Sequence, residues 1–146
     1  MKTILAAIDF SSVTQKVIDT AVNIAQPDSH IWLIHVEEID GEPADYSAGP
    51  KSVRNIVANE LKDMHSQLHN VAQEIMKQGL TVTPLLIQGV VVQAILEQCK
   101  KINADTLVVG SHGHNGLWHK LMGNVCEDLL SHTTIPLMIV PVKQQG

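Results

Sequence analysis

The chain alternates between two hydrophobic patterns. Short and almost uninterrupted apolar runs are typical of parallel strands that are covered on both faces of a sheet. Such runs occupy residues 3–9, 31–36, 81–87, 106–109 and 135–142. Between the runs, apolar residues recur every three or four positions, which predicts amphipathic helices. The predicted helices cover residues 13–26, 51–78, 92–102 and 123–132.

Single residues mark the boundaries of these elements. Gly79 stands where a glycine that caps a helix C-terminus is expected. Pro84 lies inside the third apolar run and cannot donate to a ladder, so that strand is predicted to be at an edge of the sheet. Residues 38–50 contain two glycines, two prolines and several acids, which predicts a loop near the mouth of a pocket. The apolar face predicted for the third helix consists of Val92, Ile95, Leu96, Cys99 and Ile102.

Strands that alternate with helices in this way predict an α/β fold. We expect a doubly wound, Rossmann-like sheet of five parallel strands, with helices on both faces and right-handed crossovers. A length of 146 residues is expected to form one domain, residues 1–146. Ligands of such folds bind beyond the carboxyl ends of the strands, where the strand order reverses. Asp9, Val36 and Gly110 are all predicted to lie at carboxyl ends.

Composition argues against several classes of function. The formal net charge is −5 and no basic run is present, so binding of nucleic acid through a cationic face is not expected. No apolar stretch approaches the length of a membrane span, and the N-terminus enters a strand-like run without a signal peptide. Cys99 and Cys126 form no Cys-x-x-Cys pair and are expected to be core or half-exposed thiols. We therefore expect a cytoplasmic protein.

The strongest chemical signal lies where the fourth apolar run meets the last helix. Val109-Gly110-Ser111-His112-Gly113 follows the strand, and Met122-Gly123-Asn124-Val125 opens the helix. The first two glycines let the backbone turn sharply and present bare N–H groups to a ligand. The third stands at a helix N-terminus, where N–H groups and the helix dipole favour an anion. This junction predicts a site for phosphate or for a nucleotide.

Two residues on neighbouring strands are candidates for the other half of the pocket. Asp9 can cap the helix that follows it, and it can also accept a hydrogen bond from a ribose hydroxyl or hold a cation near phosphates. Val36 is expected to be a core residue that could also pack against a planar base.

Other chemistries fit the sequence less well. His112, His114 and His119 could suggest a metal, as could His65 and His69 at helical spacing, but no cysteine or carboxylate has matching ligand spacing. The pair on the long helix is predicted to lie on an exposed face. His112, His114 and Lys120 could instead place positive charge near bound phosphates.

Hydrolysis through Ser111 and His112 is improbable, because the nucleophile elbow needs glycine where this chain has Val109. A P-loop is excluded, because no Gly-Lys-Ser/Thr follows the glycines.

These residues resemble those of the universal stress protein family over essentially the whole chain. The nucleotide-binding branch of the family has Gly, two residues, Gly, nine residues, then Gly followed by Ser or Thr. Gly110, Gly113 and Gly123 stand at that spacing. The run 4–9, the pair His35-Val36 and the segments 104–111 and 135–141 are also similar to the family.

The resemblance implies an adenine nucleotide alpha hydrolase-like fold with strand order 3-2-1-4-5 and ATP bound across the first and fourth strands. It places Ala7, Ile8, Asp9 and Val36 around adenine and ribose. It assigns ribose and phosphate to Val109, Gly110, Gly113, Gly123, Asn124 and Val125. No metal would be held by the protein alone, and Mg²⁺ would reach Asp9 only with bound ATP. It further implies a homodimer through the last strand, Leu137–Val142, whose apolar edge would otherwise be an association hazard.

One substitution changes the expected affinity. Asn124 stands where the family pattern has Ser or Thr, and its amide and backbone N–H can still donate, so binding is predicted to be weaker rather than lost. The segment Trp118–Met122 is similar to the branch of the family that lacks the glycines and holds no nucleotide.

Two functions therefore stay open. The chain is either an ATP-binding regulatory module of the stress response or a nucleotide-independent dimer that acts through contacts with an unidentified protein. No general base is evident in the sequence, so ATP turnover is expected to be slow or absent.

Overall fold

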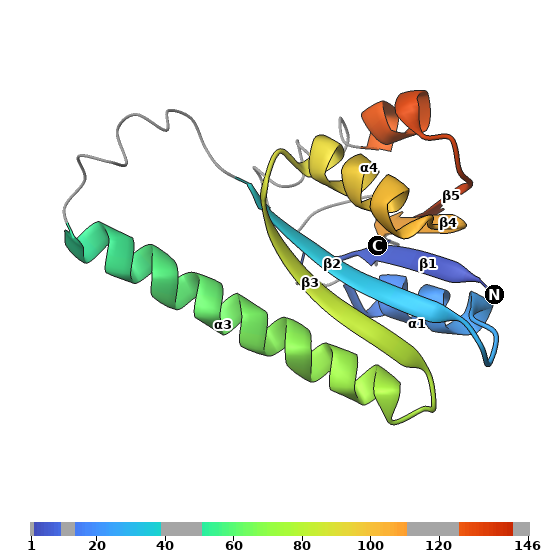
Figure 1. Cartoon of the computed structure of the whole chain (residues 1–146), viewed down its shortest axis with the longest axis horizontal. Coiled ribbons are helices and arrows are strands. Elements are labelled where there is room, and N and C mark those ends of the chain that lie inside the picture. The colour runs from blue at the N-terminus through green and yellow to red at the C-terminus, as the bar shows by residue number, and fades with distance from the viewer. Residues whose placement is uncertain (1, 10–13, 39–50, 111–125, 142–146) are drawn as a thin grey trace, which may run out of the picture.

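The fold is organised by one parallel sheet. The computed structural model describes residues 2–9, 14–38, 51–110 and 126–141, without the side chains of residues 51–61. Within these residues five strands pair in the order β3-β2-β1-β4-β5, and every pair is parallel (Figure 1). The strands are β1 (Thr3–Ala7), β2 (His30–Glu38), β3 (Thr81–Gly89), β4 (Thr106–Gly110) and β5 (Leu137–Val140). The predicted fold class and strand order are confirmed.

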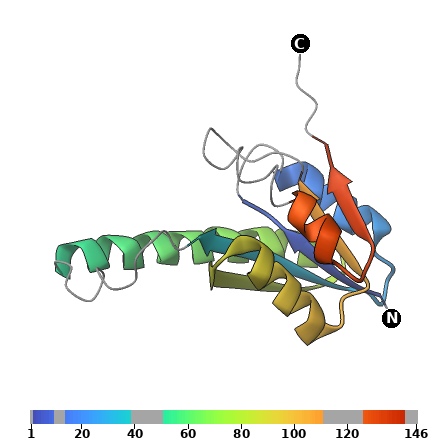
Figure 2. The same cartoon turned by 90° about the horizontal axis from the view of Figure 1, so that it is seen from above.

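Helices cover both faces of this sheet. They are α1 (Thr14–Ile24), α3 (Lys51–Met76), α4 (Val91–Ile102) and the short helical segment over residues 126–132. α1 and α3 pack into the apolar cluster on one face, while α4 and residues 126–132 pack into the cluster on the other (Figures 1 and 2). From β1 to β3 the chain moves toward one edge of the sheet, and after β3 it returns to β4 and then to β5 at the other edge. Right-handed crossovers made in opposite directions place their helices on opposite faces.

The centre of the sheet is buried on both sides, which explains the continuous apolar runs. Ile4, Leu5 and Ala6 of β1 are completely shielded from solvent, as are Leu107 and Val108 of β4. Successive side chains of a strand point to opposite faces, so a strand between two helical layers needs apolar residues at every position.

The edge position predicted for the third strand is confirmed. β3 is the outermost strand on its side, and Pro84 stands in register with Leu33 of β2. A proline fits there because an edge strand has hydrogen-bonding partners on one side only.

The apolar face predicted for α4 is confirmed. Ile95 and Cys99 are buried in the apolar cluster, and the other three predicted residues are partly buried and pack against it, namely Val92, Leu96 and Ile102. The structure also buries Val91, Ala94 and Gln98, which the prediction did not include. The small side chain of Ala94 is compatible with close packing of the helix on the sheet.

The long helix α3 packs on the sheet through its C-terminal half. Leu68 and Ile75 are buried, whereas the other end of the helix extends beyond the sheet (Figure 1). His65 and His69 lie on the exposed face, as predicted, with ring centroids 6.4 Å apart.

Two turns depend on a left-handed residue. Gly79 ends the turns after α3 with a φ of 88°, and its N–H donates to the Met76 carbonyl at 2.9 Å. Asn103 caps α4 with a φ of 54°. The chain then enters β4 through Asp105, whose carboxylate accepts from the Thr3 N–H at 2.8 Å and whose own N–H donates to the Thr3 carbonyl at 2.7 Å. These two bonds tie the start of β4 to the start of β1.

Gly79 provides a direct test of this backbone geometry. The Gly79→Ala change should lower the free energy of unfolding by about 1 kcal/mol, because an L side chain at positive φ clashes with its own backbone. Gly89→Ala is the matched control, since a Cβ at either glycine meets no atom within 4 Å and only Gly79 has a positive φ. The control should remain within about 0.5 kcal/mol of wild type in urea denaturation. Equal losses at both positions would contradict the assigned turn.

Candidate functional site

The strand order reverses between β1 and β4. From β1 the chain steps through β2 to one edge of the sheet and then returns to β4 on the other side of β1. Ala6 of β1 lies in register with Val108 of β4, so the carboxyl ends of the two strands are neighbours. Folds of this class bind ligands at this position, because the loops that leave the two strands diverge to opposite faces.

The carboxyl end of β1 carries three of the predicted site residues. Ala7 is the last residue of the strand, and it is half-buried. Ile8 continues the ladder for one more bond, from its N–H to the Ile34 carbonyl at 2.9 Å, and its side chain is buried. The predicted strand over residues 3–9 is slightly longer than β1, which ends at Ala7. Asp9 follows the ladder and is half-buried.

Asp9 also contacts the next helix. The hydroxyl of Thr14, the first residue of α1, donates to Oδ1 of Asp9 at 3.3 Å. This side-chain contact holds the Asp9 carboxylate beside the first residue of α1.

The position predicted for Val36 is wrong. β2 does not end there but continues to Glu38, because β3 pairs with it as far as Gly89. Val36 is buried in the apolar cluster on the α4 face of the sheet. Its predicted role as a core residue is confirmed.

The contact of His35 with Ile8 was not predicted from the sequence. This buried side chain reaches from β2 to β1, where its Nδ1 lies 2.8 Å from the Ile8 carbonyl oxygen. Its Nε2 lies 3.2 Å from a carboxylate oxygen of Glu37. Only the register of β1 against β2 brings these groups together, and the register has no local signal in the sequence.

The carboxyl end of β4 provides the other side of the switch point. Val109 and Gly110 are buried in the last two positions of the strand. Across the loop, the thiol of Cys126 donates to the Gly110 carbonyl at 3.7 Å. The remaining predicted site residues, Gly113, Gly123, Asn124 and Val125, lie outside the described residues, as do Ser111, His112, His114, His119 and Lys120.

The thiols are as expected from the sequence. Cys99 is buried and Cys126 is half-buried, and neither forms a disulfide. Burial raises the pKa of the Cys99 thiol to about 11 and also raises the pKa of Cys126. Both groups are therefore neutral thiols at physiological pH.

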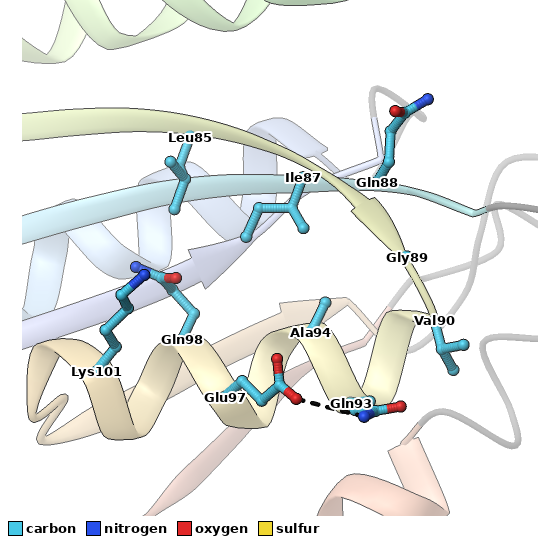
Figure 3. A pocket seen from close by; sticks show the side chains of 10 residues that line it. All are labelled: Leu85, Ile87, Gln88, Gly89, Val90, Gln93, Ala94, Glu97, Gln98 and Lys101. Carbon is cyan, nitrogen blue, oxygen red and sulfur yellow. Dashed lines mark hydrogen bonds between the residues drawn. The ribbon is translucent and has the colours of Figure 1, made fainter.

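A separate hollow of about 530 Å³ lies between β3 and α4. Leu85 and Ile87 project into it from the strand, and Gln93 of α4 donates to Glu97 at 3.3 Å (Figure 3). Its charged groups are one acid, Glu97, and one base, Lys101. One negative and one positive group together give no net charge that would favour the binding of a polyphosphate in this hollow. The described residues contain no group of three or more His, Cys, Asp or Glu that could hold a metal.

Comparison with known proteins agrees with this geometry. The sequence model of the universal stress protein family matches residues 1–141. This chain belongs to the universal stress protein family. Universal stress protein A homolog 1 of Coxiella burnetii is 32% identical to it over 150 residues, which cover 98% of each chain.

Solved structures show the same fold. The structure of MJ0577, a universal stress protein of Methanocaldococcus jannaschii, has a TM-score of 0.80 at 23% identity, with 99% of this chain and 98% of that one covered. A universal stress protein solved in complex with cAMP has a TM-score of 0.67 at 18% identity, over 96% of each chain. A family member from Arabidopsis thaliana solved with AMP bound has a TM-score of 0.64 at 20% identity, over 98% and 93% of the two chains. Some structural neighbours thus hold adenine nucleotides.

In the part of the chain that the structure describes, no helix combines the length and the apolar character that a membrane span requires.

The raised thiol pKa values predict slow alkylation. At pH 8 only about one Cys99 thiol in a thousand is a thiolate, so iodoacetamide should label it far more slowly in the folded protein than in urea. Between pH 8 and pH 10 the labelling rate should rise about tenfold per unit without a plateau, because the pKa of about 11 is not yet reached. Mass spectrometry of the two cysteine peptides measures this, and a plateau for Cys99 near pH 9 would contradict the burial described above.

Proposed function

We propose that this universal stress protein binds ATP with Mg²⁺ as a regulatory ligand at the switch point between β1 and β4. The observation that carries the proposal is the adjacency of the two carboxyl ends, one followed by Asp9 and the other ending at Gly110. An acid that can accept from a ribose hydroxyl thus faces the beginning of a glycine-containing loop that can bind phosphates.

The individual roles follow from the chemistry of each residue. Ala7, Ile8 and Val36 contribute apolar surface for adenine, and Asp9 accepts from ribose and contacts the metal carried by ATP. Backbone N–H groups at the glycine junction bind ribose and phosphates. The residues of that junction are Val109, Gly110, Gly113, Gly123, Asn124 and Val125.

Relatives support the class of ligand. Two structural neighbours contain AMP and cAMP, which share the adenine and ribose that the end of β1 is proposed to recognise. We propose a cytoplasmic location, since a reducing compartment suits two cysteines that form no disulfide. In this proposal, occupancy of the site changes a surface read by a partner protein, and turnover is slow or absent.

Isothermal titration of Mg·ATP into the purified protein tests the site. We expect micromolar binding, and Asp9→Asn should weaken it about tenfold, because the neutral amide forms a weaker hydrogen bond with ribose and a weaker contact with the metal. The amide oxygen can still accept from Thr14, so the helix contact is kept. Asp19→Asn is the matched control, because Asp19 is exposed on α1 and bonds only with Gln15 at 2.9 Å among the contacts described. It should leave the affinity unchanged.

The same titration separates the two open functions. Gly113→Val should abolish binding if the glycine loop holds the phosphates. No heat from the wild-type protein would reject the nucleotide site and favour a dimer that acts through protein contacts alone. Equal weakening by Asp9→Asn and Asp19→Asn would show that net charge, and not the end of β1, controls affinity.

We also propose that β5 forms a homodimer by antiparallel pairing. β5 is an edge strand with Met138 and Ile139 more than a third exposed, while Val140 is buried. An exposed apolar edge is a hazard for a monomer, and two-fold pairing would cover it. The strand ends at Val140 within the described residues, so the proposed interface is centred on Leu137–Val140 rather than on the longer segment to Val142.

Sedimentation velocity tests this interface. The wild-type protein should sediment as a dimer, and Ile139→Lys should convert it to a monomer, because paired edges would bury two lysines against each other. Val90→Lys is the control, since Val90 is 59% exposed just before α4, on the other half of the sheet. A dimer that survives Ile139→Lys but not Val90→Lys would place the interface elsewhere.

A further inference from the structure

The main chain of Ile8 is held on both of its sides, through its N–H and through its carbonyl oxygen. The Ile8 N–H donates to the Ile34 carbonyl at 2.9 Å and so extends the pairing of β1 with β2 by one residue. On the other side the Ile8 carbonyl oxygen lies 2.8 Å from Nδ1 of His35. The carbonyl of Ile8 and the N–H of Asp9 belong to one planar unit, so fixing the oxygen also fixes the direction of the Asp9 N–H.

His35 is well suited to this contact. Its side chain is only 5% exposed, so the bond to Ile8 is shielded from competing water. Its second nitrogen, Nε2, lies 3.2 Å from Oε2 of Glu37, two residues further along the same strand. The Ile8 carbonyl oxygen can only accept, so a hydrogen on Nδ1 makes the bond that holds it. Glu37 contacts the other nitrogen of the same ring.

The side chain of Asp9 is held independently, by the Thr14 hydroxyl at 3.3 Å. Backbone and side chain of Asp9 thus depend on different elements, β2 through His35 and α1 through Thr14. A site residue whose orientation is fixed before binding loses less entropy when the ligand arrives.

We propose that His35 is a positioning residue for the nucleotide site. Through the Ile8 carbonyl it sets the orientation of Asp9 toward the ligand, while Glu37 holds the ring in place. The inference rests on the proposed binding of ATP beside Asp9, and it assigns a functional part to a buried histidine that does not itself contact the ligand.

Two substitutions at His35 separate positioning from packing. His35→Leu replaces the ring with an apolar side chain of similar size and removes the donor to Ile8. His35→Asn places an amide N–H₂ close to where Nδ1 stood, so it keeps a donor to Ile8 and loses the contact with Glu37. His30→Leu is the matched control, because His30 lies at the opposite end of β2, where its Nε2 is 2.7 Å from the Thr83 hydroxyl.

The first readout is the affinity for Mg·ATP, measured by titration calorimetry beside the melting temperature. His35→Leu should raise Kd about tenfold, and His35→Asn should recover most of that loss. His30→Leu should lower the melting temperature without changing Kd. Loss of affinity in both His35 variants, or an equal loss in His30→Leu, would overturn the proposal, because general destabilisation would then explain it.

The second readout needs no nucleotide. Amide hydrogen exchange of Ile8 and Asp9, followed by NMR, should be about tenfold faster in His35→Leu than in wild type and close to wild type in His35→Asn. Unchanged exchange in His35→Leu would overturn the proposal. If the wild-type chain binds no ATP, the proposed function fails, and the exchange rates alone then decide whether His35 fixes the end of β1.

Discussion

The pairing of β1 with a parallel strand on each side is the constraint on which the rest of the structure depends. With helices on both faces of the sheet, the centre of β1, Ile4–Ala6, is completely buried and therefore requires apolar residues at every position. The same pairing also brings the carboxyl ends of β1 and β4 together, while α1 and residues 126–132 pack into the apolar clusters on opposite faces of the sheet. Asp9 follows the end of β1, and Gly110 is the last residue of β4.

The contacts at the end of β1 form a connected set. Ile34 and His35 of β2 hold Ile8, and Thr14 of α1 holds Asp9. On the β4 side, Cys126 bonds to the Gly110 carbonyl across the loop. Each strand end is thus joined to a neighbouring element by a side chain, which suits a site whose ligand has to find its contacts in place. The family relationship and the nucleotides held by two structural neighbours agree with this interpretation.

Much of the fold could be predicted from the sequence, because burial on both faces leaves a clear one-dimensional pattern. The five strands, their order and the edge position of Pro84 follow from apolar runs, from the family resemblance and from the chemistry of proline. The length of β2 did not follow. Glu37 and Glu38 pair with Gln88 and Gly89 through backbone bonds, which need no apolar side chains. That is why Val36 was placed too close to the end of the strand.

The candidate site could be predicted only where it depends on residues close in sequence. Asp9 and the glycine spacing could be proposed from the sequence, since each has a local signal next to a strand end. The contact of His35 with Ile8 joins residues 27 positions apart and depends on the register between β1 and β2. The burial of Ala94 and Gln98 in α4, beside the predicted apolar face, is a similar case, because it depends on how closely the helix packs against the sheet.

The most direct test of the nucleotide site is an NMR titration of the ¹⁵N-labelled protein with Mg·ATP. The account predicts that the backbone amides of Ile8, Asp9 and Gly110 shift together, while those of Thr3 and Thr106, at the opposite ends of the same two strands, stay in place. Shifts confined to the hollow between β3 and α4, or no shifts at millimolar ATP, would contradict it.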